Sequence, residues 1–208
     1  VDLNRAIEID PQFAPAFARR ANVRLLRGEL EFADADYRQA DQLDEASSGQ
    51  FQLMKLVDRA HYDLQSGRVE QALAAVDEAL ELSPNHPPAL HVRTLALLAA
   101  DELVEALEAT EQLREEVGDS PSVLLLRAQT QGELGEFEAA WETYDEALLT
   151  TQSPTAPHRG ALLAGRAFVR AGLGDLEGAE RDLNAAIPLC PDSGWLHYQQ
   201  GRVYHERQ

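Results

Sequence analysis

Apolar residues recur along the chain at the spacing expected of helices that are buried on one face. In the clearest example, just after Gly135, they follow one another at i, i+3, i+4, i+7 and i+11. These residues are Phe137, Ala140, Trp141, Tyr144 and Leu148. A second apolar run, VLLLRAQTQGELG, begins at Val123 and leads into the glycine. The pattern predicts two helices joined by a short turn, each with one apolar stripe.

The same pattern occurs five times along the chain. Stretches that begin at residues 28, 67, 101, 135 and 174 align with one another, and each has an alanine at its sixth place. These alanines are Ala33, Ala72, Ala106, Ala140 and Ala179. The intervals between them are 39, 34, 34 and 39 residues, so the period is 34 with five extra residues twice. We expect the extra residues to lengthen loops, because SGQF at 48–51 and SPTAPHR at 153–159 are rich in turn formers.

Glycine occupies the turn in four repeats, and Asp101, which adopts a left-handed conformation less readily, occupies it in the third. The helix before each turn also carries a small residue in register. These residues are Ala21, Ala60, Thr94, Ala128 and Ala167, and Gly201 holds the same place in the last half repeat. Together with the alanines after the turn, they predict two antiparallel helices that cross closely, since a larger side chain at either place would force them apart. Pro188 is expected to end the last second helix early or to bend it.

This pattern resembles the tetratricopeptide repeat, a unit of 34 residues. The places typical of that family are held in the first repeat by Phe17, Ala21, Ala33, Tyr37 and Ala40, and in the fourth by Leu124, Ala128, Ala140, Tyr144 and Ala147. The third repeat departs from it at Thr110 and Leu113. The resemblance implies an all-α fold, a right-handed α-solenoid of antiparallel helix pairs that forms a single domain over 1–208. We place a half repeat at 1–13, full repeats at 14–47, 53–86, 87–120, 121–154 and 160–193, and a half repeat at 194–208.

The resemblance also implies a concave groove lined by the first helix of each pair, where a protein or peptide partner would bind. The groove residues expected from the register are Asn22, Val57, His61, His91, Leu95, Leu125, Gln129, Phe168 and Tyr198. None of them is acidic, although the chain has a net charge of −18. We therefore expect a carboxylate-poor groove for an extended or helical peptide with apolar anchors. The alternative is that the chain's own neighbouring residues cover part of this stripe.

One mode of peptide binding in the family is disfavoured. Members that bind the C-terminal carboxylate of a chaperone use lysines and asparagines of the first helices. Asn22 occupies such a place, but Lys55 is the single lysine of the chain. The usual clamp therefore cannot be assembled.

An arginine precedes the small residue of each first helix. These arginines are Arg20, Arg59, Arg93, Arg127 and Arg166. They could form an anion-binding ladder for an acidic partner. The interpretation we favour is that their stems line the seams between helices and their guanidinium groups pair with acids such as Asp36 and Asp182.

Composition narrows the class of function. The 36 acidic residues against 18 basic ones repel nucleic acid and anionic membranes, so neither is expected as a partner. No apolar stretch is long enough for a membrane-spanning helix, and the first residues do not resemble a signal peptide. We expect a soluble segment of the cytoplasm or periplasm. The preponderance of arginine over lysine and the many alanines favour a GC-rich bacterial genome.

The sequence predicts no enzyme and no cofactor. Phosphate-binding loops, nucleophile elbows and paired cysteines are absent from it. The six histidines have no i, i+4 pair that would suggest a metal site. Cys190, the single cysteine, is expected to be a small apolar residue at a helix end.

Both ends of the sequence resemble half of a helix pair, and the chain does not begin with Met. We expect either further repeats in the full protein or self-association through these ends. The primary hypothesis is a non-catalytic interaction scaffold. The alternatives are the substrate-holding region of a larger enzyme, such as a glycosyltransferase or kinase, and a self-assembling scaffold.

Overall fold

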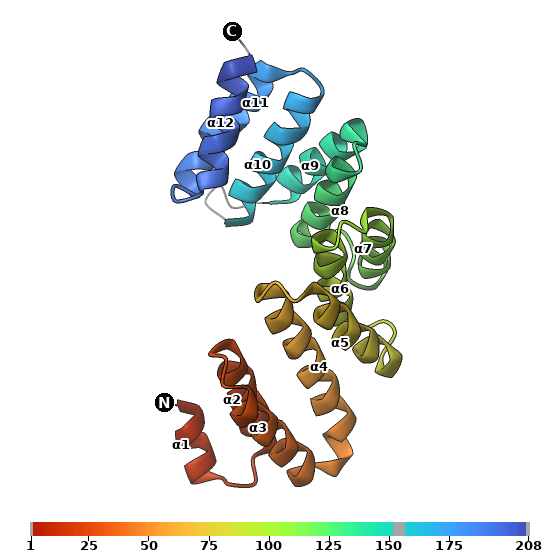
Figure 1. Ribbon diagram of the computed structural model, residues 1–208, viewed down its shortest axis with the longest axis vertical. Helices are drawn as coiled ribbons and strands as arrows, with labels where there is room; N and C mark the ends of the chain where they lie inside the picture. Colours follow the sequence, from red (N-terminus) through yellow and green to blue (C-terminus); the bar gives the residue numbers. More distant parts are fainter. Residues whose placement is uncertain (1, 152–156, 207–208) are drawn as a thin grey trace. The chain divides into compact units, whose positions relative to one another are not determined.

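The computed structural model describes residues 2–151 and 157–206, which form α-helices, short 3-10 turns and loops (Figure 1). Within these residues there are twelve α-helices and no strand. The prediction of an all-α helical repeat fold is confirmed. The α-helices are α1 (Asp2–Ile9), α2 (Ala14–Leu26), α3 (Leu30–Leu43), α4 (Ser48–Gln65), α5 (Val69–Leu82), α6 (Pro87–Ala99), α7 (Leu103–Val117), α8 (Pro121–Glu133), α9 (Phe137–Thr150), α10 (Pro157–Gly172), α11 (Leu176–Ala186) and α12 (Gly194–Glu206).

The chain divides into two compact units, an N-terminal unit over Val1–Ala100 and a C-terminal unit over Asp101–Gln208. The division falls between α6 and α7, which are the two helices of the third predicted repeat. A continuous superhelix over the whole chain stays a prediction.

In the N-terminal unit each helix packs against the next one along the chain, from α1 to α6. The first helices of successive pairs also touch, α2 with α4 and α4 with α6. Two clusters of buried side chains hold the pairs together, one around Tyr37 and Phe51 and the other around Leu56 and Val76. The unit is therefore stabilised by contacts between neighbouring repeats, as expected of a repeat protein.

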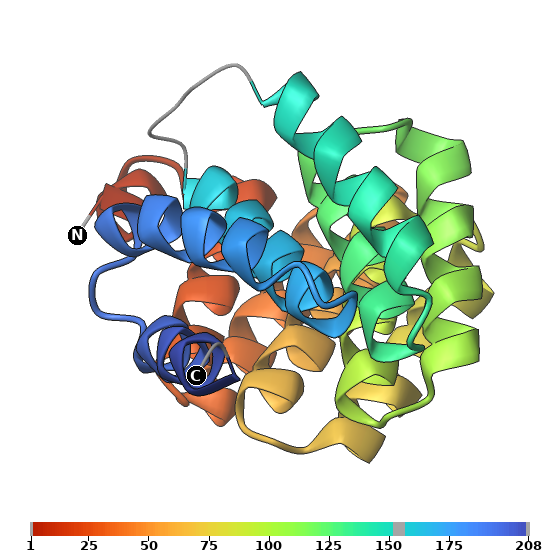
Figure 2. The same cartoon turned by 90° about the horizontal axis from the view of Figure 1, so that it is seen from above.

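The C-terminal unit is built in the same way from α7 to α12. Its first helices α8, α10 and α12 lie next to one another, with α10 in contact with both of the others. Figure 2 shows α8 and α9 running side by side in this unit. Its two core clusters centre on Leu124 and Tyr144 and on Leu183 and Leu196. None of the helices in the described part of the chain is long and apolar enough to cross a bilayer.

The turns have the conformation that their residues predict. The glycines at the turns of four repeats have a positive φ, between 72° and 81°. Asp101 has φ 63° and is the one non-glycine residue with positive φ in the described ranges. A left-handed turn after the first helix is thus kept in the third repeat without a glycine.

The nine small residues predicted at the helix crossings are all buried, with at most 1% of each exposed. They are Ala21, Ala33, Ala60, Ala72, Ala106, Ala128, Ala140, Ala167 and Ala179. Partners from one helix pair occur in the same buried cluster, as with Ala21 and Ala33, and with Ala128 and Ala140.

Two expectations about helix ends have different outcomes. SGQF was expected in a loop, but residues 48–51 form the first turn of α4, which is 18 residues long. The expectation was wrong because the residues that follow continue the apolar helical pattern, so the extra residues lengthen the helix. Only part of SPTAPHR lies within the described residues, and there α10 begins at Pro157. Pro188 acts as predicted, because α11 ends at Ala186 and a 3-10 turn, Ile187–Leu189, follows.

Candidate binding surface

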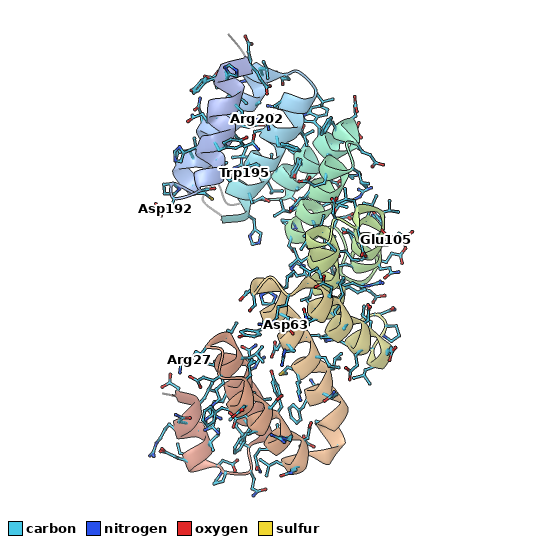
Figure 3. All side chains as sticks on the ribbon, viewed as in Figure 1. Arg27, Asp63, Glu105, Asp192, Trp195 and Arg202 are labelled. Carbon is cyan, nitrogen blue, oxygen red and sulfur yellow. The ribbon has the colours of Figure 1, made fainter. Side chains whose placement is uncertain are left out.

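The first helices of the C-terminal unit enclose a cavity of about 530 Å³. Leu125 of α8, Phe168 of α10 and Trp195 of α12 supply large apolar walls. Trp195 lies at the start of α12, beside α10 (Figure 3). Its walls suit an apolar side chain or a small apolar ligand.

Small residues of α10 form one wall of this cavity. Gly160, Ala161, Ala164 and Gly165 all line it. A β-carbon at Gly160 would lie 2.7 Å from the sulfur atom of Cys190, closer than such atoms approach. A β-carbon at Gly165 would overlap the ring and hydroxyl group of Tyr144. The two glycines therefore let α10 pack directly against these side chains.

Tyr144 contributes a polar group to an otherwise apolar wall. Its side chain is only 3% exposed, and it lines the cavity. Among the described residues its hydroxyl group has no hydrogen-bond partner. Burial, together with the negative charge of Glu133, raises the pKa of Tyr144 well above its ordinary value. The phenol is therefore a hydrogen-bond donor at any physiological pH.

Other polar residues also line the cavity. Gln129 and Glu133 are exposed residues of α8 that line it. Gln199 is largely buried and accepts a hydrogen bond of 3.4 Å from Arg202. Glu133 is the charged side chain among the described residues that line the cavity.

The structure brings together three of the four groove residues predicted for this unit. Leu125, Gln129 and Phe168 line the cavity, whereas Tyr198 is 64% exposed and is not part of the lining. The sequence reasoning missed Trp195 and Gln199, which hold on α12 the register positions of Ala161 and Gly165 on α10. It also missed Glu133, one helical turn after Gln129. A wider stripe on each first helix would have included all three.

In the N-terminal unit the predicted groove residues are less uniform. Val57 is only 9% exposed and belongs to a core cluster, so neighbouring side chains cover most of it. It also lines a second cavity of about 220 Å³, together with Met54 and His86. Asn22 and Leu95 are partly exposed but lie outside that cavity.

His61 and His91 lie on the same face of the N-terminal unit. Burial, and to a lesser extent the charge of His61, lowers the pKa of His91. A ring nitrogen of His61 lies 2.8 Å from the side-chain nitrogen of Gln65. In the described part of the chain no three histidine, cysteine or acidic side chains are placed to hold a metal ion.

All five arginines of the register column pair with acids of the chain. Arg20 and Arg166 each donate two hydrogen bonds to an aspartate sixteen residues later, Asp36 or Asp182, at 2.7 and 2.8 Å. Arg166 also pairs with Asp145. These pairs agree with the structural interpretation of the column rather than with an anion-binding ladder.

The other three arginines have no acid at that place. Arg93 and Arg127 each form an ion pair with an acid sixteen residues earlier, Asp77 and Glu111 respectively. Arg59 pairs within its own helix with Asp63, at 2.8 Å. Figure 3 labels Asp63.

Comparison with known proteins agrees with the repeat pattern. The family model described as tetratricopeptide repeat matches residues 63–130. The helix pairs on either side of this segment have the same architecture and the same turn geometry. Residues 63–130 therefore match the tetratricopeptide repeat family, and the described helix pairs on either side have the fold of that repeat. The rice (Oryza sativa subsp. japonica) DnaJ protein P58IPK homolog B is 25% identical to the chain over 154 residues, which are 70% of this chain and 33% of the relative.

Solved structures show the same fold at low sequence identity. A chain of the APC/C hetero-tetramer Cut9-Hcn1 aligns with a TM-score of 0.78 at 16% identity, over 97% of this chain and 38% of that chain. The tetratricopeptide repeat protein YrrB, described as having an unusual peptide-binding site, aligns with a TM-score of 0.64 at 17% identity, over 100% of this chain and 98% of its own. The chain thus spans about a third of the length of the rice relative and of the Cut9-Hcn1 chain.

Proposed function

We propose that this protein is a non-catalytic tetratricopeptide repeat scaffold that binds a peptide or protein partner on the face formed by its first helices. The observation that carries the proposal is the cavity of about 530 Å³ with its walls of Leu125, Phe168 and Trp195. Ligand pockets in proteins usually have volumes of about 300–1,000 Å³. An apolar side chain of the partner that enters it would gain about 25 cal/mol for each Å² that it buries.

The distribution of carboxylates supports this choice of surface. Exposed acidic residues are frequent on the second helices, for example Glu105 and Glu108 of α7 and Glu142 of α9 (Figure 3 labels Glu105). In the described part of the chain, the lining of the cavity contains one carboxylate, that of Glu133. An apolar anchor can therefore be desolvated there without burying many charges.

Selection of peptides from a random displayed library tests the proposal. We expect the wild-type protein to retain peptides with large apolar residues. The double variant His61→Glu and Leu95→Glu disrupts the predicted groove of the N-terminal unit, and Gln129→Glu with Ala161→Glu disrupts the cavity. All four positions are at least partly exposed, so circular dichroism should stay unchanged. At least one of these variants should lose the selected peptides.

The matched control places the same charges on a second-helix surface. Val104 of α7 and Leu149 of α9 are exposed apolar residues, and their double replacement by Glu should leave peptide binding unchanged. Equal peptide binding by the wild type and both first-helix variants would refute the proposed surface.

Self-association is a second candidate function. Tyr198 and Tyr204 of α12 are large side chains that are substantially exposed. Sedimentation analysis at several concentrations would show a mass that rises with concentration, and replacement of both tyrosines by Ser should abolish the rise.

A further inference from the structure

The cavity of the C-terminal unit has features that restrict the chemistry of its ligand. Most of its large side chains are apolar, and among its polar residues are Tyr144, with a hydroxyl group, and Glu133, with a carboxylate. These two groups come from different helices, α9 and α8. Each lacks something that a ligand could supply.

The hydroxyl group of Tyr144 lacks an acceptor. The side chain is almost fully buried and lines the cavity, yet no described residue accepts a hydrogen bond from it. The close approach of Gly165 holds the hydroxyl group in place. A carbonyl oxygen of a bound peptide backbone would be a suitable acceptor.

The carboxylate of Glu133 lacks a cation. It is exposed, and no described residue forms an ion pair with it. Arg166 and Arg202 of the first helices pair with other acids, Arg166 with two aspartates and Arg202 with Glu206. The charge of Glu133 acts on Tyr144, so the two polar groups lie within electrostatic reach of each other.

The net charge of the whole chain also favours a cationic ligand. With a net charge of −18, it attracts cationic partners and repels anionic ones at long range. Among the described residues, none that lines the cavity is basic. A ligand carboxylate would therefore meet repulsion without a compensating partner, whereas a lysine or arginine would find one.

We infer that this cavity binds a basic peptide in which a large apolar side chain is next to a lysine or arginine. The apolar side chain fills the space between Leu125, Phe168 and Trp195. Tyr144 donates a hydrogen bond to a backbone carbonyl group of the peptide, and Glu133 pairs with the neighbouring cation. This inference rests on the proposed function and adds the chemistry of the partner.

Three synthetic peptides with blocked ends provide the probe. The first has phenylalanine flanked by arginine and lysine, the second has the same phenylalanine flanked by two glutamates, and the third has alanine in place of the phenylalanine. Trp195 reports binding by its fluorescence in the full chain carrying Trp141→Phe, because the chain has two tryptophans. We expect the first peptide to bind at least tenfold more tightly than either of the others, and its affinity to fall as salt is added.

Two variants test the two polar groups separately. Glu133→Gln should weaken the first peptide about fivefold and reduce its advantage over the glutamate peptide, whereas Glu136→Gln, an exposed residue outside the lining, should not. Tyr144→Phe should also weaken the first peptide about fivefold. It should leave the unfolding midpoint unchanged or raised, because the lost hydroxyl group has no partner in the free protein. A purely structural tyrosine would instead lower the midpoint.

A second measurement places the peptide. Cys190 is the single cysteine and lines the cavity, so bound peptide should slow its alkylation. The inference is overturned if the basic and acidic peptides bind equally, if neither Glu133→Gln nor Tyr144→Phe alters binding, or if alkylation of Cys190 is unaffected. Tight binding of the glutamate peptide, with protection of Cys190, would overturn the basic preference but leave the proposed function intact. Failure of all apolar peptides, including those from the displayed library, would overturn both.

Discussion

Gly165 of α10 lies directly against the phenolic ring of Tyr144 of α9, so closely that a β-carbon at residue 165 would overlap it. A Gly165→Ala variant should therefore be less stable, by about 1 kcal/mol. Overpacking costs about 1–3 kcal/mol, and the better helix propensity of alanine offsets up to about 1 kcal/mol of this. Urea denaturation would measure the change.

Gly201 provides the matched control. It lies inside α12, and a β-carbon there would meet no atom within 4 Å. Gly201→Ala should stabilise the protein by about 0.5–1 kcal/mol. If both alanine variants are stabilised equally, the contact between Gly165 and Tyr144 does not restrict the site.

The second prediction concerns a buried ion cluster in the N-terminal unit. Asp36 is almost fully buried and receives hydrogen bonds from Arg20 and Arg24. Asp36→Asn should cost about 2–3 kcal/mol of unfolding free energy, because two guanidinium groups lose their counter-charge. Asp34 on the same helix forms a more exposed pair with Lys55, so Asp34→Asn should cost less than about 1 kcal/mol. Equal losses would show that burial of the carboxylate does not matter.

A third prediction concerns the small residues of the helix crossings. Ala72 is fully buried, and Ala74 on the same helix is exposed. Replacing Ala72 with Leu should destabilise the protein by about 1–3 kcal/mol through overpacking, whereas Ala74→Leu should change stability by less than about 0.5 kcal/mol. Thermal or chemical unfolding would compare them. Tolerance of leucine at residue 72 would contradict the close crossing of α4 and α5.

The fourth prediction concerns pH. The folded protein holds the pKa of His91 below its ordinary value of 6.5, so the unfolded chain takes up the proton more readily. Its contribution to stability is present above pH 6.5 and is lost as the pH falls from there through the folded pKa. The stability lost between pH 7.5 and pH 5.5 should be smaller in His91→Gln than in the wild type. His205→Gln, at an exposed position, should retain the wild-type loss.

The fold could be predicted in detail from the sequence because the same local pattern of residues occurs in each repeat. The alanine columns, the glycine turns and the early end of α11 before Pro188 all follow from side-chain size and backbone preference. The length of α4 did not, because SGQF contains turn formers but Phe51 packs in the buried cluster around Tyr37 as part of the helix. Contacts with adjacent helices can override such weak local signals.

The cavity was predictable only in part. The register identified Leu125, Gln129 and Phe168, since they repeat a pattern. It did not identify Trp195, which lies outside the narrow stripe chosen on each first helix, or the role of Tyr144, whose position depends on the close approach of Gly165. A periodic sequence predicts the common architecture well, but a specific site arises where one repeat differs from the others.

The arginine column limits how freely these repeats could be recombined. Arg20 finds its acid within its own helix pair, whereas Arg93 and Arg127 depend on an acid in the preceding helix. In a chimera that moved residues 121–154 behind a repeat without such an acid, the guanidinium group of Arg127 would lose its ion-pair partner. The repeats are therefore not interchangeable modules, because some ion pairs form only when the repeats follow one another in this order.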